Sequence, residues 1–252
     1  MKLRLRPLGQ TGLHVSELGF GCASFWANRR FPEGAAIDLV QAAVEGGINH
    51  FDTGASYGCG RGEVRLGKAI REIPRERLIL SSKAGTLCHG RHGTRKAFSP
   101  QALRDSLHAS LERLQTDHLD ILYLHGPGSS HLGEELTDTL QQLRHEGLAH
   151  HIGINSFDSE LVLAASRHPL FEVFMIEYNI LRQGNLALTA QLHRSGKGVV
   201  AGSALGRALY SRRRLDFSRP GNLWYLLRAL VTSRGDLAAS RRFRSLEGAE
   251  GL

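Results

Sequence analysis

Short apolar runs rich in branched residues alternate with longer amphipathic stretches from residue 17 onward. Seven of these runs have the length and composition of buried strands: 17–24, 48–53, 77–83, 119–125, 150–155, 171–179 and 197–203. Their starts lie about one βα unit apart along the chain, which predicts a parallel sheet with helical crossovers.

Four stretches between these runs carry apolar residues at three-to-four spacing, which predicts amphipathic helices. They are 35–47, 63–73, 99–114 and 134–147. Ser99 followed by Pro100 is typical of a helix start, and the glycines at the ends of the first and last stretch are typical of helix stops. Ahead of the sheet, alternation on both sides of residues 9–12 predicts a β-hairpin that could plug one end of a barrel.

Polar side chains occur at or just past the ends of the predicted strands. They are Asp52, Lys83, His125, Asn155, Tyr178, Asn179 and Ser203. In a closed barrel of parallel strands these ends converge on one mouth, whereas in an open doubly wound sheet they spread along one edge. Either arrangement predicts a ligand site at the carboxyl ends of the strands.

Tyr57 and Lys83 offer acid–base chemistry at that edge. A buried lysine beside a tyrosine favours the phenolate and lowers the pKa of the phenol, and Asp52 would keep the lysine charged. We therefore expect Tyr57 to be a usable proton donor near neutral pH, with His125 bonding the same substrate oxygen. The nearby glycines, in the spacing G-x-G-x-G, do not match a dinucleotide fingerprint and indicate a loop.

Several segments together resemble a known family. FDTGASYG, the lysine of LILSSK, the histidine of LDILYLHGP, GLAHHIGINSF and EYNIL are similar in order and spacing to the aldo/keto reductases over roughly residues 3–206. The resemblance implies a (β/α)8 TIM-type barrel, a nicotinamide cofactor and a catalytic tetrad. In the tetrad Tyr57 would be the general acid, and Lys83 would lower the pKa of its phenol. Asp52 would pair with Lys83, and His125 would orient the substrate.

The same resemblance implies cofactor contacts from later segments. The positions are Asn155, Ser156, Tyr178, Ser203, Leu205 and Gly206. Tyr178 would stack on the nicotinamide, and the last three would wrap the pyrophosphate. The chain departs from the family pattern at three places, where Asn155-Ser156 replaces Ser-Asn, Met175 replaces Gln and Ala204 replaces Pro.

The βα rhythm stops after residue 206, so no eighth strand is predicted. We expect an α/β barrel of TIM type, truncated after the seventh strand and spanning residues 1–206. Residues 207–252 would form an Arg-rich helical segment that packs on the barrel and is not a separate domain. Open strand edges need a cover, which these helices or a second subunit could supply, so a homo-oligomer is one expectation. The arginines at 212–214 could bind the cofactor phosphate.

Charge and composition narrow the class of partner. The chain has 252 residues and a formal charge of +8, and residues 207–244 hold ten arginines and two acidic residues, so the remainder is neutral. We predict no nucleic-acid partner. No apolar run long enough for a membrane span and no signal-peptide pattern is seen, which predicts no membrane partner and a cytoplasmic protein.

The three cysteines, Cys22, Cys59 and Cys88, are odd in number and form no C-x-x-C pair, so we expect free thiols in a reducing compartment. Cys88, His89 and His92 resemble metal ligands, but without a fourth ligand in view they indicate a substrate-facing loop and no metal is predicted.

Three functions remain open. The first is reduction of an aldehyde or ketone with NADPH, or with NADH, through Tyr57 as general acid. The second is a proton-transfer enzyme that uses the same tetrad without redox chemistry, and the third is a non-catalytic regulator. The intact tetrad favours the first two, whereas the missing eighth strand favours the last two. The substrate would be a small carbonyl compound, and loops 84–98, 126–132 and 207–222 carry no code for its identity.

Overall fold

The protein is described by a computed structural model that covers residues 3–23, 26–90, 93–204, 235–236 and 239. The chain divides into two compact units. The first comprises Met1–Met175 and Ala190–Val200, and the second comprises Ile176–Thr189 and Ala201–Leu252. Leu205 and Gly206, and nearly all of the Arg-rich segment, lie outside the described residues. The predicted role of that segment therefore stays a prediction.

Seven strands form one sheet, and each matches one of the seven predicted runs to within one residue beyond its ends. They are β3 (Phe20–Gly21), β4 (His50–Asp52), β5 (Ile79–Ala84), β8 (Leu119–His125), β9 (Ala149–Asn155), β10 (Phe171–Glu177) and β11 (Gly198–Gly202). Their order is β11-β10-β9-β8-β5-β4-β3, and the pairs from β3 to β10 are parallel. The predicted α/β fold with a parallel sheet is confirmed, and the described residues contribute no eighth strand to this sheet.

The predicted N-terminal hairpin is confirmed as β1 (Leu5–Pro7) paired antiparallel with β2 (His14–Ser16). Leu8 and Val15 from this hairpin join a buried apolar cluster whose other members come from the strands: Ile79, Ile121, Tyr123, Val173 and Met175. The hairpin turn is also held to the first unit, because the amide of Gln10 donates to the carbonyl of Gly196 at 2.8 Å. The hairpin thus covers the apolar part of the inner face of the sheet.

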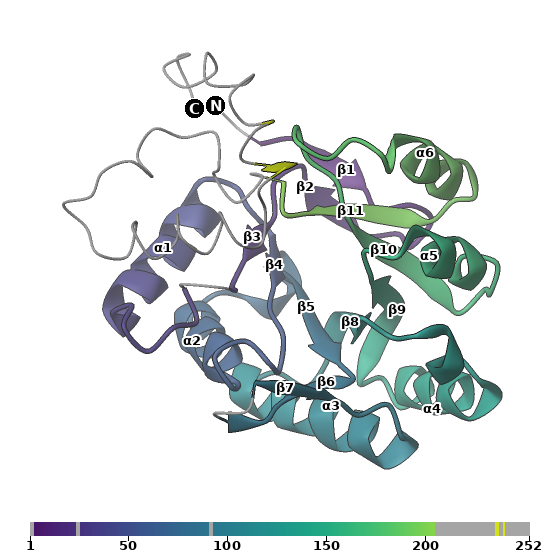
Figure 1. The fold of residues 1–252 in the computed structure, drawn as a ribbon. Coiled ribbons are helices and arrows are strands. Elements are labelled where there is room, and N and C mark those ends of the chain that lie inside the picture. The colour runs from purple at the N-terminus through teal and green to yellow at the C-terminus, as the bar shows by residue number, and fades with distance from the viewer. Residues whose placement is uncertain (1–2, 24–25, 91–92, 205–234, 237–238, 240–252) are drawn as a thin grey trace. The chain divides into compact units, whose positions relative to one another are not determined.

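Helices follow the strands in the βα manner, as Figure 1 shows for the crossovers of the first unit. They are α1 (Glu33–Glu45), α2 (Arg61–Ile70), α3 (Pro100–Leu114), α4 (Glu134–His145), α5 (Ser159–Ala165) and α6 (Leu186–Arg194), with 3-10 turns at Arg75–Arg77 and Ser129–His131. The predicted start of α3 is confirmed, because the Ser99 side chain accepts from the amide of Ala102 at 3.4 Å. Gly47 and Gly147, just past α1 and α4, have φ of 90° and 75°, the left-handed conformation that ends helices.

A second hairpin, β6 (Thr86–Cys88) with β7 (Thr94–Lys96), follows β5 and was not predicted. Cys88 on β6 forms a disulfide with Cys59, and their Cα atoms are 5.1 Å apart. The prediction of three free thiols is therefore wrong for these two residues, because the count and spacing of cysteines do not reveal which loops the fold brings together. Cys22 is free, as predicted, and it is buried.

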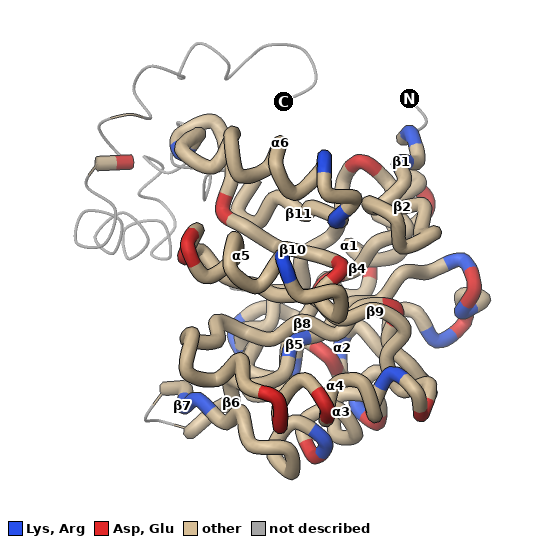
Figure 2. Tube along the Cα trace, turned by 90° about the vertical axis from the view of Figure 1, so that its right-hand side faces the viewer, with Lys and Arg blue, Asp and Glu red and all other residues tan. Residues whose placement is uncertain are grey.

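Charged residues of both signs are interspersed along the described chain, as the blue and red segments of Figure 2 show. In the second unit, Arg182 donates to the carboxylates of Glu177 at 2.7 Å and Asp236 at 2.9 Å.

Within the described residues, no helix is long and apolar enough to cross a bilayer.

Candidate active site

The site residues on the strands share one face of the sheet. In the parallel registers Asp52 pairs with Ser81, Lys83 pairs with Tyr123, and His125 pairs with Asn155. Paired residues of parallel neighbours point to the same side of a sheet, and residues two apart on one strand do so as well. The face that buries Ile79 and Ile121 at one end of the strands therefore carries Lys83 and His125 at the carboxyl end.

Asp52, Tyr57, Lys83 and His125 come together at that end. The Lys83 ammonium donates to Asp52 Oδ2 at 2.5 Å and to the backbone carbonyl of Thr53 at 2.6 Å. The same nitrogen lies 4.8 Å from the centroid of the Tyr57 ring. The rings of Tyr57 and His125 meet edge to face with centroids 5.8 Å apart. The structure thus brings the four predicted tetrad residues into one cluster.

Lys83 carries its charge inside the protein, because its side chain has no exposed surface. Burial lowers the pKa of Lys83, but the carboxylate of Asp52 and the neighbouring Tyr57 raise it by more, so the pKa ends above its ordinary value. The group is therefore an ammonium ion at neutral pH.

Tyr57 behaves differently from the sequence-based prediction. Burial raises the pKa of its phenol, and the positive charge of Lys83 lowers it by less, so the pKa lies above 10. The prediction of a lowered pKa is wrong in its net direction, because the cost of burying a phenolate was left out. The phenol is consequently protonated at neutral pH, with a fixed positive charge beside it.

His125 is neutral at physiological pH. Burial, together with the charges of Lys83 and Lys96, lowers its pKa to about 4. Its Nδ1 lies 3.5 Å from the hydroxyl of Ser56, next to the tyrosine. A neutral imidazole can still donate one hydrogen bond, so His125 can orient a polar substrate without adding a second positive charge.

Two buried residues behind Asp52, Ser81 and His50, form a chain of hydrogen bonds that the sequence analysis did not predict. The Ser81 hydroxyl donates to Asp52 Oδ1 at 2.9 Å, and His50 Nε2 lies 3.2 Å from the same hydroxyl. Because the hydroxyl proton points to Asp52, His50 must donate to Ser81 from Nε2. His50 and Ser81 stand two residues before Asp52 and Lys83 on the same strands, so the two-residue period of a strand was the signal that could have found them.

The opposite face of β5 is anchored by a buried carboxylate. Glu63 on α2 has no exposed side-chain surface, and it accepts from Ser82 Oγ at 2.5 Å and from Arg113 Nε on α3 at 2.6 Å. Ser82 precedes Lys83 directly, so this contact fixes the end of the strand that presents the lysine to the site.

The predicted cofactor positions fall in both units. In the first unit, Asn155 is half-buried and pairs in register with Met175, and its side-chain amide donates to the Met175 carbonyl at 3.4 Å. Ser156 is buried and accepts from the amide of Asp158 at 3.2 Å. In the second unit, Tyr178 is half-buried, and Ser203 is exposed with a φ of 56°. Leu205 and Gly206 lie outside the described residues.

One cluster with metal-ligand chemistry lies at the amino ends of the strands, away from the tetrad. The potential ligand atoms of His118, Asp120 and His150 all lie within 4.8 Å of one another. Asp120, however, is paired with the Arg75 guanidinium at 2.6 Å and accepts from the amide of Leu80 at 2.8 Å. The ion pair with Arg75 and the hydrogen bond from Leu80 therefore explain why a carboxylate is buried at this position without a metal ion.

Comparison with known proteins decides the family, because the family model for aldo/keto reductases matches residues 17–227. The chain belongs to the aldo/keto reductase family. It is 30% identical over 219 residues to a protein named probable aldo-keto reductase 1 from Glycine max, and the match covers 85% of this chain and 63% of that relative. It is 33% identical over 223 residues to an L-galactose dehydrogenase from Arabidopsis thaliana, which covers 84% of this chain and 68% of that enzyme.

Solved structures agree with this assignment. The holo form of an aldo-keto reductase from Bacillus halodurans superposes with a TM-score of 0.77 at 30% identity, over 83% of this chain and 69% of that chain. The chain thus spans about two thirds of the length of these aldo/keto reductases.

Proposed function

We propose that this aldo/keto reductase is an oxidoreductase that reduces a small aldehyde or ketone to an alcohol with NADPH, NADH being the alternative cofactor. The observation that supports this most directly is the buried Lys83 ammonium, held by the Asp52 carboxylate and lying 4.8 Å from the ring of Tyr57. A fully buried ammonium requires compensation, and its placement against a protonated phenol favours proton donation.

Tyr57 gives up its phenolic proton to the carbonyl oxygen of the substrate as that oxygen becomes an alkoxide. The Lys83 charge, already the main lowering influence on the pKa of Tyr57, stabilises the phenolate that results. Asp52 keeps Lys83 charged and in place, and neutral His125 donates a hydrogen bond that orients the substrate oxygen. A bound nicotinamide supplies the hydride that the carbonyl carbon accepts.

Asn155 fits the amide part of such a cofactor. Its side chain is half-buried at the carboxyl end of β9, in register with His125, and it makes one long hydrogen bond at 3.4 Å. A carboxamide in that position can turn to bind another amide. Met175, opposite Asn155, offers only an apolar surface, so we infer that the nicotinamide amide is held by fewer polar groups than in the family pattern. Ser156, Tyr178, Ser203, Leu205 and Gly206 remain proposed contacts.

The test is a comparison of wild-type protein with Tyr57→Phe. The phenylalanine keeps the ring and removes the proton, so we expect kcat for carbonyl reduction to fall by about 10² to 10⁴-fold. NADPH affinity, measured by calorimetry, should change by less than about twofold, because the hydroxyl contributes to the chemical step. A phenylalanine variant with full turnover would falsify the assignment.

The same experiment separates the alternatives. An isomerase would lose activity with the phenylalanine substitution but would turn over without nicotinamide, and a regulator would lose no function at all.

Three further expectations also stay predictions. They are residence in the cytoplasm, the absence of a nucleic-acid or membrane partner, and a homo-oligomer that covers the open sheet edge. Fractionation of the native host and light scattering of the purified protein test these points.

A further inference from the structure

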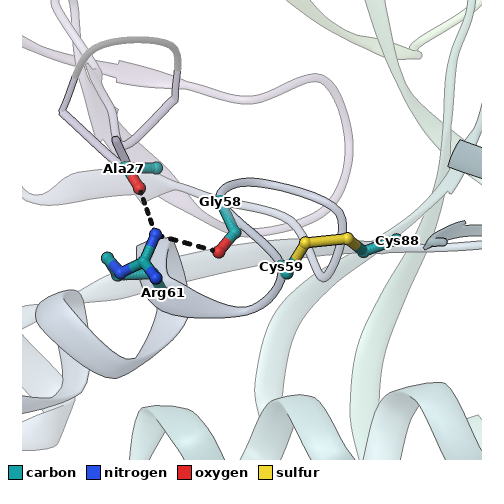
Figure 3. The surroundings of a disulfide bond; sticks show 5 residues. All are labelled: Ala27, Gly58, Cys59, Arg61 and Cys88. Carbon is teal, nitrogen blue, oxygen red and sulfur yellow. Dashed lines mark hydrogen bonds between the residues drawn. A yellow bond between two sulfur atoms is a disulfide. The ribbon is translucent and has the colours of Figure 1, made fainter. Parts of the chain in front are cut away.

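The Cys59–Cys88 disulfide joins the loop that carries Tyr57 to the β6–β7 hairpin (Figure 3). Cys59 lies two residues after Tyr57, and Cys88 lies five residues after Lys83. The Cys59 residue is exposed and Cys88 is partly exposed, so a small thiol can reach the bond. Two thiols close to a catalytic pair and open to solvent are in the position that redox control requires.

The hairpin itself is fastened to the other side of the tetrad. Lys96 on β7 donates to the backbone carbonyls of His125 and Gly126, both at 2.8 Å. Thr86 on β6 also donates to the His125 carbonyl at 2.7 Å, and it accepts from Lys96 at 2.9 Å. The hairpin therefore keeps its contact with His125 by hydrogen bonds that do not depend on the disulfide.

The loop that follows Tyr57 has weaker anchors of its own. Gly58, Cys59 and Gly60 all have left-handed backbone, with φ of 59°, 56° and 83°. Glycine adopts this conformation readily, but a residue with a side chain does so at a cost. Next to Cys59 the hydrogen bonds are long, because its amide donates to the Ser56 carbonyl at 3.3 Å and the Arg61 side chain donates to the carbonyls of Ala27 and Gly58 at 3.4 Å in each case. Shorter bonds flank this turn, from the amide of Tyr57 to the Gly54 carbonyl at 2.9 Å and from the amide of Gly62 to the Tyr57 carbonyl at 3.1 Å.

We propose that the Cys59–Cys88 disulfide is a reversible latch that positions Tyr57 against Lys83 and His125, so that reduction of the bond slows catalysis. This inference rests on the proposed function. With the disulfide formed, the Tyr57 loop is connected through the β6–β7 hairpin to the backbone of His125. With the disulfide reduced, the hairpin keeps its hydrogen bonds to His125, and the Tyr57 loop loses its covalent connection to it.

The chemistry is thiol–disulfide exchange. A dithiol attacks the bond, two new S–H groups form on Cys59 and Cys88, and the dithiol leaves as its own disulfide. In the reverse direction, a low-molecular-weight disulfide such as glutathione disulfide accepts the two electrons and is released as two thiols, while Cys59 and Cys88 become joined. Cys22 is buried and its thiol pKa is raised by burial, so it takes no part.

The test compares oxidised wild-type protein, the same protein treated with dithiothreitol, and the double variant Cys59→Ser/Cys88→Ser. Cys22→Ala serves as the matched control for effects of reductant on the third cysteine. Thiol titration in denaturant should find one thiol in the oxidised wild type and three after reduction, since the chain has three cysteines. Because a displacement of about 1 Å can cost up to about 10²-fold, we expect kcat to fall at least about tenfold on reduction. NADPH affinity should stay within about twofold, and glutathione disulfide should restore the rate.

Amide hydrogen exchange in residues 54–62 gives a readout that does not need turnover. We expect faster exchange in the reduced protein and in the double variant, and no change on adding dithiothreitol to the variant. Equal exchange and equal kcat in oxidised and reduced protein, or three free thiols under oxidising conditions, would overturn the latch. If no form reduces any carbonyl but exchange still depends on the disulfide, the bond positions the Tyr57 loop as proposed, and it is the proposed function, with the effect on catalysis, that fails.

Discussion

The buried ion pair of Lys83 and Asp52 allows the electrostatics of the site to be tested directly. The Lys83 side chain is fully buried, and its ammonium also donates to the Thr53 carbonyl at 2.6 Å. Asp52→Asn keeps the shape of the side chain but removes the counter-charge. Losing one partner of a buried pair costs about 3–5 kcal/mol. Since the Asp52 side chain is 16% exposed, we expect the lower end, about 3 kcal/mol at pH 7.

The pH dependence identifies the cause. In the wild type the pKa of Lys83 is raised, so its stabilising effect is present below the unfolded-state pKa and is lost as pH rises through the folded-state pKa. In Asp52→Asn, the burial of Lys83 is no longer opposed by the Asp52 carboxylate, and the pKa of Lys83 falls. A lysine with a lowered pKa destabilises the fold below its unfolded-state pKa and stops doing so as pH rises. The gap in unfolding free energy between the two proteins should therefore shrink from pH 7 to pH 10.

The assay is urea denaturation followed by far-UV circular dichroism at pH 7, 8.5 and 10. The control is the double variant Asp52→Asn/Lys83→Met, in which a neutral pair replaces the ion pair. Such replacements are often neutral or stabilising, so we expect the double variant to lie within about 1 kcal/mol of the wild type. An Asp52→Asn protein as stable as the wild type at pH 7, or a double variant no more stable than the single one, would show that an unpaired Lys83 charge is not the source of the instability.

Three further perturbations test the neighbourhood of the tetrad. A pKa lowered from 6.5 to about 4 means that wild-type protein loses about 3 kcal/mol of stability as pH falls from 6.5 to 4, because only the unfolded His125 binds a proton there. His125→Asn should lack this loss, which urea denaturation of both proteins between pH 6.5 and pH 4 would measure. If the free energy of unfolding falls equally with pH in the variant and the wild type, His125 is not the group responsible. Glu63→Gln leaves Arg113 without its carboxylate partner and should cost about 3 kcal/mol in urea denaturation, whereas Glu72→Gln, an exposed control, should cost less than about 0.5 kcal/mol. Gly153→Ala places a methyl group against the Val173 carbonyl oxygen and the Tyr123 ring and should lower the melting temperature with a cost of about 1–3 kcal/mol. An unchanged melting temperature would show that the backbone of the sheet can move to accept the methyl group.

The sheet was predictable because its strands are buried on both faces. All six residues of β5 are buried, as are Leu119 to Leu124 of β8, and each strand begins with apolar residues that stand out in the sequence even though β5 continues with Ser81, Ser82 and Lys83. The β6–β7 hairpin was not predictable in this way. Its strands have three residues each, β7 is exposed throughout, and its pairing is held in part by Lys96 contacts to a distant backbone.

The tetrad was predictable because it lies at the carboxyl ends of strands, where the order of the strands decides which residues meet. The partners behind it were harder to find, since a serine or histidine inside an apolar strand has the same pattern as any buried polar residue. His50 and Ser81 acquire a role only when β4 and β5 are known to be neighbours. The net pKa of Tyr57 was also out of reach, because it depends on how much of the ring the fold buries.

The disulfide shows how a conclusion about the compartment can depend on a missing piece of geometry. Cys59 and Cys88 are 29 residues apart, and their number and spacing give no sign of a pair. Once β4 and β5 are adjacent, the segments that follow them leave the same edge of the sheet, and a cysteine seven residues past Asp52 can meet one five residues past Lys83. Because two of the three cysteines are paired, their number no longer indicates a reducing compartment. A bond between one exposed and one partly exposed residue that forms and breaks reversibly is compatible with either redox environment, so the state of this disulfide in the living cell, and not the cysteine count, is the quantity that bears on location.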